Sequence, residues 1–192
     1  MRIGRTLHRL ERSLLQRYYG FDRWHIGHAG EAYAADIVRR LNAWPDTGRQ
    51  TVVEIGCGLG DILRHLRFGT RLGLDRDSRV LDAARFLSRF GAGPPPRLEV
   101  WDFPAKRLVG THNAIIMVNW IHDIEPEQLR LAVGDLFSAH LAPGGSLVLD
   151  TVQDPTYTYN HDIQRLAPPG AVTDHLGRYA RNRDVWFIRR SL

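Results

Sequence analysis

The sequence predicts an α/β protein with a doubly wound, mostly parallel sheet, N-terminal helices before the sheet and a C-terminal antiparallel hairpin after it. From Thr51 onward, short apolar segments alternate with stretches of helical periodicity, which is typical of strands joined by crossover helices. The segment 113–119, NAIIMVN, is apolar enough to be covered on both faces, as parallel strands are. Residues 177–190, GRYARNRDVWFIRR, indicate two strands of a terminal hairpin.

Two helices are expected before the first strand. In the first helix, apolar residues recur at three- and four-residue steps, at Ile3, Leu7, Leu10, Leu14 and Tyr18. An ordered loop rich in aromatic, histidine and glycine residues is expected at 18–30, and a second helix at 31–44 ends before Pro45. We therefore expect residues 1–50 to form a helical cap on the substrate side and residues 51–192 to form the ligand-binding core.

The core is expected to alternate strands with helices. The expected strands lie at 51–55, 71–75, 98–102, 113–119 and 146–152. The expected helices lie at 61–67, 78–90 and 126–141, and the sequence APGG ends the last of them. Residues 153–176 are rich in turn-forming residues, with room for one short helix.

A glycine-rich turn follows the first expected strand, in the sequence VVEIGCGLGD at 52–61. Dinucleotide-binding folds use Gly-x-Gly-x-x-Gly, with a pyrophosphate at the start of the following helix. Here the spacing is Gly56-x-Gly58-x-Gly60, and Asp61 stands in the place of the third glycine of that motif. An acid at a helix start opposes a phosphate, and the sequence has no Gly-Lys-Ser or Gly-Lys-Thr that could form a P-loop. The turn therefore favours an adenosine ligand without phosphates.

Residues 52–152 resemble the core of the class I S-adenosylmethionine-dependent methyltransferases. Five motifs occur in the order and spacing of that family: VVEIGCGLGD, LGLDRD, VWDF, VNWIHDI and LAPGGSLVL. The resemblance implies a Rossmann-like fold, S-adenosyl-L-methionine as the cofactor and methyl transfer as the reaction.

The resemblance also implies a set of cofactor-binding residues at the glycine turn and at the ends of the following strands. They are Glu54, Gly56, Cys57, Gly58, Gly60, Asp75, Arg76, Asp102, Phe103, Asn119 and Trp120. Asp75 is expected to accept hydrogen bonds from both ribose hydroxyls, and Asp102 with Phe103 to face the adenine. Trp120 is expected to shield the sulfonium, because an aromatic face attracts a cation.

Two of these residues have a second interpretation. Glu54 either contacts the ligand or only hydrogen-bonds the glycine turn and shapes it. Cys57 is expected to be a small filler rather than a reacting thiol.

His122 is the candidate catalytic base, because it follows the fourth expected strand and an unperturbed histidine has a pKa of about 6.5. The alternative is a histidine that anchors this loop through Asp123. A base is needed only if the acceptor carries a proton at the working pH. No metal site is expected, because no pair of histidines lies beside carboxylates on one helical face.

The acceptor pocket is expected to come from two segments outside the shared core, 18–30 and 153–165. Aromatic and imidazole side chains there suit a flat or phenolic molecule. The expected substrate-binding residues are Tyr19, Trp24, His25, His28, Tyr157, Tyr159 and His161. The same residue types in loops also commonly close a core.

Composition limits the surroundings in which the protein works. The net charge of +5 comes largely from arginine-rich ends, which suit solvated surface better than a nucleic-acid patch. Cys57 is the only cysteine, so no intrachain disulfide forms, and together with the absence of a secretory signal this favours a cytoplasmic location. No apolar run reaches the roughly 20 residues of a membrane span. The first helix could serve as a lid, a homodimer contact or a membrane-surface helix, and packing onto the core is the use we favour.

These observations predict a methyltransferase that acts on a small-molecule acceptor, with a place in bacterial secondary metabolism. A first alternative is a relative that binds the cofactor without methyl transfer, since fold does not certify chemistry. A second is a nucleic-acid methyltransferase, which is disfavoured because the Asn-Trp-Ile-His sequence at 119–122 lacks the two prolines of exocyclic-amine methylases. The glycine spacing argues against an NAD-dependent oxidoreductase. The acceptor atom stays open.

Overall fold

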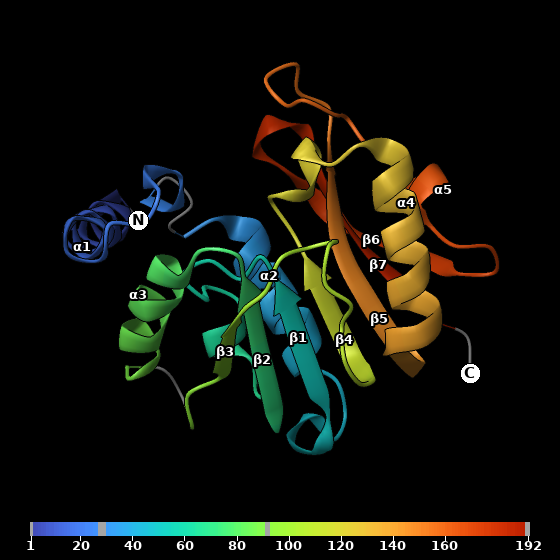
Figure 1. Cartoon of the computed structure of the whole chain (residues 1–192), viewed down its shortest axis with the longest axis horizontal. Helices are drawn as coiled ribbons and strands as arrows, with labels where there is room; N and C mark the ends of the chain where they lie inside the picture. The colour runs from blue at the N-terminus through green and yellow to red at the C-terminus, as the bar shows by residue number, and fades with distance from the viewer. Residues whose placement is uncertain (1, 27–29, 91–92, 191–192) are drawn as a thin grey trace.

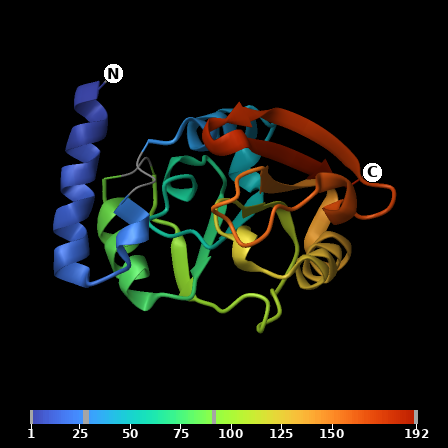
Figure 2. The same ribbon diagram turned by 90° about the horizontal axis from the view of Figure 1, so that it is seen from above.

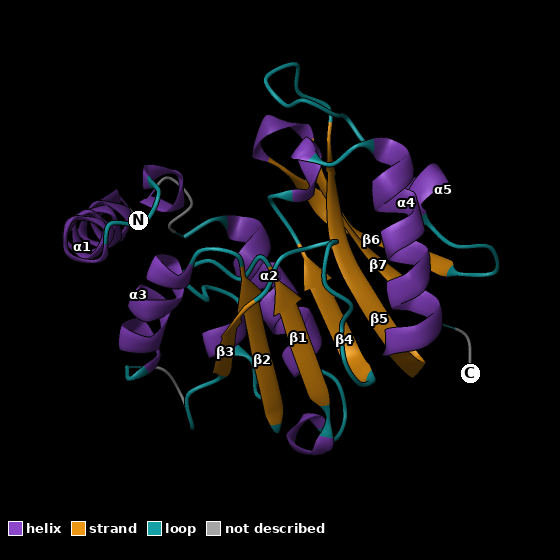
Figure 3. Ribbon diagram, in the orientation of Figure 1, coloured by secondary structure: helices purple, strands orange, loops and turns teal. Residues whose placement is uncertain are grey.

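The computed structural model describes residues 2–26, 30–90 and 93–190, which form one seven-stranded sheet flanked by helices (Figures 1 and 3). The strand order is β3-β2-β1-β4-β5-β7-β6. The strands are β1 Thr51–Ile55, β2 Thr70–Asp75, β3 Arg97–Val100, β4 His112–Met117, β5 Leu141–Val152, β6 Val172–Tyr179 and β7 Arg183–Arg189. The first five strands run parallel, and β7 runs antiparallel to both β5 and β6. The predicted fold class is confirmed.

Five α-helices and several shorter turns precede or connect the strands in the described part of the chain. The α-helices are α1 Arg2–Tyr19, α2 Ala32–Asn42, α3 Ser78–Ser88, α4 Pro126–Asp135 and α5 Ile163–Leu166. The short 3₁₀ turns are η1 Arg23–Ile26, η2 Thr47–Arg49, η3 Leu63–His65, η4 Ile121–Asp123 and η6 Ala180–Asn182, and η5 Leu136–His140 is a π-helical turn. None of the described helices is long and apolar enough to cross a bilayer.

The two faces of the sheet carry separate apolar clusters, as a doubly wound sheet requires. Val52 of β1 packs in one cluster with Ile37 of α2, while the next residue, Val53, packs in the other cluster with Leu129 of α4. All four side chains are fully buried. Burial of each aliphatic side chain of this kind stabilises the fold by roughly 1.5–3 kcal/mol. The alternation along one strand therefore holds helices on both sides of it.

Helix α1 packs outside these two layers, beside α3 (Figure 2). Leu15 and Phe21 form a third cluster with Val80 and Leu87 of α3. The assignment of residues 1–50 to one cap stays a prediction, since α2 covers the sheet while α1 covers α3.

The order of the strands reverses between β1 and β4, which lie side by side in the middle of the sheet (Figure 1). In open α/β sheets, ligands bind in the crevice at the carboxyl ends of the strands where the order reverses. The carboxyl ends of β1, β2 and β4 carry the glycine turn, Asp75 and Asn119, so the fold brings these parts of the sequence together.

The helix predicted at 61–67 is wrong, because only the 3₁₀ turn η3 forms there. The carboxylate of Glu54 in β1 accepts a hydrogen bond from the backbone N–H of Leu63 at 3.0 Å. The side chains of Ile62, Leu63 and Leu66 are buried. An anchor from the neighbouring strand and burial of three aliphatic side chains fix this segment without a regular helix.

The APGG sequence lies within β5. The strand expected at 146–152 did not include these residues. Leu141 of β5 lies opposite His112, and Ser146 lies opposite Ala114, so the residues between them form a bulge. Helix α4 ends at Asp135, and η5 continues to the start of β5. The proline and glycines that were expected to end a helix therefore form the bulge of β5 instead.

Candidate functional site

The glycine turn between β1 and η3 holds its three glycines in the left-handed region. Their φ angles are +71° at Gly56, +51° at Gly58 and +71° at Gly60. The backbone N–H groups of Gly56 and Cys57 both donate to the carbonyl of Leu74 in β2, at 2.7 and 3.0 Å. Residues that carry a Cβ rarely adopt such φ values, so the backbone conformation of the turn itself requires glycine.

Two aromatic side chains lie directly over this turn. A Cβ added at Gly56 would lie 2.3 Å from Nε1 of Trp120, and one at Gly58 would lie 3.0 Å from Nδ1 of His25. A Cβ at Gly60 would meet nothing within 4 Å among the described residues. At Gly56 and Gly58, the groups that lie close to the backbone are thus protein side chains. The sequence did not indicate that Trp120 and His25 would cover the turn.

Asp75 ends β2 beside the turn. Its Oδ2 accepts a hydrogen bond from the N–H of Gly58 at 2.9 Å, and its Oδ1 accepts one from the N–H of Asp77 at 3.0 Å. The side chain is buried. The carboxylate therefore fixes both the glycine turn and the approach to α3, at the edge of the larger cavity described below.

Glu54 and Cys57 lie beneath the turn, and both are buried. The hydrogen bond from Leu63 supports the interpretation in which Glu54 shapes the turn, although its side chain also lines a cavity. Burial raises the pKa of the Glu54 carboxyl well above its usual value. Burial also raises the pKa of the Cys57 thiol well above its usual value, which keeps the thiol protonated and unreactive.

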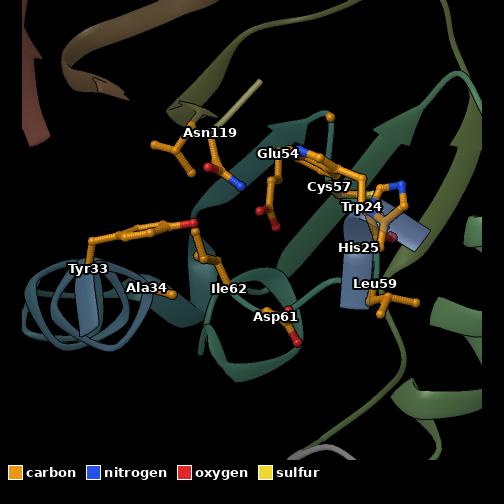
Figure 4. A pocket seen from close by; sticks show the side chains of 13 residues that line it. Trp24, His25, Tyr33, Ala34, Glu54, Cys57, Leu59, Asp61, Ile62 and Asn119 are labelled. Atoms are coloured by element: carbon orange, nitrogen blue, oxygen red, sulfur yellow. Dashed lines mark hydrogen bonds between the residues drawn. The ribbon is translucent and has the colours of Figure 1, made fainter. Parts of the chain in front are cut away.

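Two cavities adjoin the turn and share Trp24, His25, Gly56 and Asn119 in their walls. The smaller, of about 60 Å³, lies on the side of α2. Glu54, Asn119 and Tyr33 direct their polar ends toward one another across it (Figure 4). The larger, of about 700 Å³, extends over the ends of β2 and β4 and the loop after β3. Seven of the expected cofactor residues line it: Gly56, Asp75, Arg76, Asp102, Phe103, Asn119 and Trp120.

Asn119 and Trp120 follow β4, and Asn119 lines both cavities while Trp120 lines the larger one. Asn119 has φ +75°, and its buried Oδ1 has no hydrogen-bond partner among the described residues. The indole N–H of Trp120 donates to the carbonyl of Ile55 at 2.7 Å, and its ring meets Phe103 edge-on at 5.3 Å between centroids. The wall over Gly56 is thus fixed by a hydrogen bond to β1 and by an aromatic contact.

His122 lines the larger cavity, and only 1% of the residue is exposed. Its Nε2 lies 3.0 Å from Oδ2 of Asp150, which also pairs with Arg183. Burial, together with the nearby Arg183 cation, lowers the pKa of His122 to about 3. The imidazole is therefore neutral and anchored. Its anchor is Asp150, whereas the carboxylate of Asp123 accepts a hydrogen bond from the hydroxyl of Thr158.

Four of the residues expected to bind the acceptor either line the larger cavity or support the loop that carries His122. Trp24, His25 and Tyr157 line the larger cavity. His161 is buried and hydrogen-bonds the carbonyl of Ile121 at 3.0 Å, so it supports the loop that carries His122.

Of the other three residues expected to bind the acceptor, two line neither cavity and one lies outside the described residues. The backbone N–H of Tyr159 donates to the carbonyl of His122 at 3.0 Å. Tyr19 packs against the apolar cluster of α1 and α3. His28 lies outside the described residues.

Several lining residues were absent from the sequence prediction. Tyr33, Asp61 and Trp101 line the cavities, as do Asp22, Asp77 and Arg79. Tyr33 is spaced with Ile37 and Leu41 on one face of α2, so its periodicity indicated only core. Trp101 precedes Asp102 in the VWDF motif, which was a usable signal. Among the described residues, no group of three or more His, Cys, Asp or Glu side chains could hold a metal ion.

The topology and the glycine turn at the carboxyl ends of the strands define the class of fold. The chain has the fold of the class I S-adenosylmethionine-dependent methyltransferases, as solved structures of such enzymes show. No protein-family model matches the sequence, and no curated protein matches it.

Three similar structures span most of the chain. Magnesium protoporphyrin IX methyltransferase (ChlM) from Synechocystis, with S-adenosylmethionine bound, superposes with a TM-score of 0.71 at 16% identity, covering 98% of this chain and 96% of its own. The N-methyltransferase NodS from Bradyrhizobium japonicum, with S-adenosylhomocysteine bound, gives 0.68 at 19% identity, with 93% and 97% covered. CalS10, an amino pentose methyltransferase from Micromonospora echinaspora, gives 0.65 at 20% identity, with 87% and 94% covered.

Proposed function

We propose that the protein transfers a methyl group from S-adenosyl-L-methionine to a small-molecule acceptor. The observation that carries this proposal is the position of the glycine turn, with Asp75 against it, where the two cavities meet. A nucleoside that ends in an amino acid would lie along both cavities, past Gly56 and Asn119. ChlM, NodS and CalS10 are all described as methyltransferases, and each has been seen with the cofactor or its demethylated product.

The charges of the larger cavity fit a cationic nucleoside. Its walls carry five carboxylates, from Asp22, Asp75, Asp77, Asp102 and Asp123, and two guanidinium groups, from Arg76 and Arg79. Arg79 is already paired with Asp77 at 3.0 Å. A net negative cavity in a chain of charge +5 attracts a sulfonium and opposes the diphosphate of a dinucleotide.

The unpaired Oδ1 atom of Asn119, buried in the described part of the chain, also fits this cofactor. Oδ1 is a buried acceptor without a partner in the described part of the chain, and such a group costs free energy unless a donor reaches it. Asn119 lines the smaller cavity together with Glu54, whose carboxylate points toward the Asn119 amide (Figure 4). An ammonium group is a donor of the right charge for this position.

We assign the remaining roles by position. Asp75 would hold the ribose hydroxyls, and Asp102 with Phe103 would face the adenine. Trp120, fixed over Gly56, would shield the sulfonium. Bound S-adenosylmethionine supplies an electrophilic methyl group, so the protein contributes mainly orientation and exclusion of water.

The acceptor end of the cavity is formed by Trp24, His25, His122 and Tyr157. His122 holds a proton on Nε2 when it donates to Asp150. Its Nδ1 atom then carries a lone pair, is buried and has no partner among the described residues, so it would accept a hydrogen bond from an N–H or O–H group of the acceptor. A neutral imidazole whose pKa is lowered to about 3 orients such a group and takes its proton only as the methyl is transferred. A cavity of about 700 Å³ is of the size that encloses a small molecule.

A role in bacterial secondary metabolism and a cytoplasmic location stay part of this proposal. The single, buried free cysteine is compatible with a reducing compartment. A homodimer is equally a proposal, to be tested by sedimentation of the full chain.

Two measurements test the function. Calorimetry should show that the full chain binds S-adenosylmethionine and S-adenosylhomocysteine but not NAD. A labelled-methyl assay over a panel of amines, phenols and carboxylic acids should then show transfer to one class of acceptor. Binding of NAD in place of S-adenosylmethionine contradicts the proposal, and tight cofactor binding without transfer to any acceptor supports the non-methylating alternative. A salt-dependent gel shift with RNA or DNA supports the nucleic-acid alternative.

A further inference from the structure

Asp150 is a fully buried carboxylate near the carboxyl end of β5. Three donors from two segments converge on it, two from the loop after β4 and one from the start of β7. Oδ1 accepts the backbone N–H of Asn119 at 2.7 Å. Oδ2 lies 3.0 Å from Nε2 of His122 and also pairs with the guanidinium of Arg183. Buried charges are retained in proteins when they are paired and hydrogen-bonded, and this one is both.

The bond from Asn119 holds a backbone conformation that an asparagine tolerates but does not prefer. With φ at +75°, Asn119 lies in the left-handed region, where its N–H points to Asp150 and its side chain lines both cavities. A non-glycine residue stays in this region when its surroundings over-determine it. The carboxylate of Asp150 is the contact that fixes the N–H.

The second contact selects one tautomer of His122. A carboxylate accepts hydrogen bonds, so the nitrogen facing it, Nε2, carries the proton. Nδ1 then carries the lone pair, and it has no partner among the described residues. The charged and titratable groups around this ring are Asp150, Arg183, Asp123, His161 and Tyr157.

The third contact comes from the hairpin. Arg183 begins β7, is buried, and donates to the hydroxyl of Tyr157 at 2.9 Å. Its guanidinium also lies 5.4 Å from the centre of the Tyr33 ring. One cation thus neutralises Asp150 and contacts a side chain from the wall of each cavity, since Tyr33 lines the smaller and Tyr157 the larger.

We propose that Asp150 is a positioning residue for methyl transfer: it fixes Asn119 in its left-handed conformation and fixes His122 as the Nε2–H tautomer, with Arg183 as counter-charge. This inference rests on the proposed function, because Asn119 lies at the cofactor and His122 at the acceptor. Asp150 acts through these two residues and touches neither ligand.

The first test requires no variant and no cofactor. In ¹⁵N-histidine-labelled full chain, two-bond ¹⁵N–¹H correlations should report His122 as the neutral Nε2–H tautomer between pH 6 and 8. The amide proton of Asn119 should exchange slowly. A predominant Nδ1–H tautomer, or rapid exchange at Asn119, contradicts the proposal whether or not the protein proves to be a methyltransferase.

The second test compares Asp150→Asn with Asp184→Asn. An asparagine has one acceptor oxygen, so it loses either the Asn119 contact or the Nε2–H tautomer of His122. Asp184 provides a matched control, because it accepts a hydrogen bond from His175 at 2.8 Å in the hairpin and lines neither cavity.

We expect Asp150→Asn to lower the turnover number about 100-fold, the order caused by misplacing a reacting group by about 1 Å, with a smaller change in the KM for the acceptor. Asp184→Asn should stay within about 2-fold of the parent.

A folded Asp150→Asn protein with unchanged turnover contradicts the proposal, as does a loss of turnover that only follows the unfolded fraction. If Asp150→Asn does not fold, the double variant Asp150→Asn with Arg183→Gln, which removes both charges, is measured in its place. An unmodified chain that transfers no methyl group refutes the proposed function and leaves the tautomer result standing.

Discussion

The carboxylate of Asp75 accepts a hydrogen bond from the backbone N–H of Gly58 at 2.9 Å, so the acid that ends β2 holds the turn that ends β1. The second oxygen of the same carboxylate accepts from Asp77. Asp75 therefore fixes the shape of the turn and, in the proposed function, offers its remaining lone pairs to the ribose hydroxyls.

Asp75→Ala should weaken binding of S-adenosylmethionine by about 10- to 100-fold, because a hydrogen bond to a charged group contributes about 1.5–3 kcal/mol. The measurement is calorimetry at fixed salt, with the free energy of unfolding taken from urea titration. Asp82→Asn is the control, since that side chain is 54% exposed on α3 and pairs with Arg85. Equal affinities for the Asp75 and Asp82 variants contradict the ribose assignment.

Gly56→Ala should destabilise the protein more than Gly60→Ala. Both glycines have φ of +71°, so the two variants have the same backbone strain. Only at Gly56 does the new Cβ collide with another side chain, at 2.3 Å from Nε1 of Trp120. Overpacking of this kind costs about 1–3 kcal/mol beyond the strain.

Urea titration of both variants gives the difference in the free energy of unfolding. Gly56→Ala combined with Trp120→Ala should recover part of the loss, since the collision is then removed. Similar losses at the two glycines, or no recovery in the double variant, show that the indole does not constrain the turn.

The features that were predicted correctly are encoded within short segments. Strand β4 is recognisable from its own apolar run, and the positions of the glycine turn after β1 and of Asp75 at the end of β2 each follow from a local motif. The ligand contacts assigned to these residues stay predictions. The same locality explains why the hairpin and the sheet class followed from the sequence.

The features that were missed depend on partners far along the chain. The 3₁₀ turn η3 replaces a helix because Glu54 of the preceding strand bonds Leu63. The anchor of His122 is Asp150, 28 positions away, rather than its neighbour Asp123. No periodicity or spacing encodes such pairings, because the fold creates them.

Arg12→Met should loosen α1 from the glycine turn. The guanidinium of Arg12 is buried, donates to the carbonyl of His25 at 3.1 Å and pairs with Asp61 at 2.5 Å. The Asp61 side chain is 27% exposed, so solvent screens the pair in part, and a loss of about 1–3 kcal/mol is expected. Methionine retains the apolar stem and removes the charge.

Hydrogen exchange across α1 and the free energy of unfolding report this change. Arg39→Met removes half of a pair with Asp36 in which Arg39 is 77% exposed, and it should change stability by less than about 0.5 kcal/mol. If exchange in α1 is unaltered by Arg12→Met, the ion pair does not hold the helix.

The protonation of His122 should make folding stability depend on pH. Its pKa is about 3 in the folded protein and 6.5 when unperturbed. Between these values the unfolded chain binds the proton and the folded chain does not, so stability is full above pH 6.5 and falls as the pH is lowered. Within that window the loss from this one group approaches about 1.4 kcal/mol per pH unit.

His122→Gln keeps an N–H that can donate to Asp150 and removes the titrating ring. Urea titrations at pH 7.5, 6.5, 5.5 and 4.5 should therefore show the parent losing stability faster than the variant as the pH falls. The difference between the two curves isolates His122 from the carboxylates, which titrate in both proteins. A constant difference between parent and His122→Gln across this range means that the imidazole is not held neutral, and the assignment of its lone pair to the acceptor then fails.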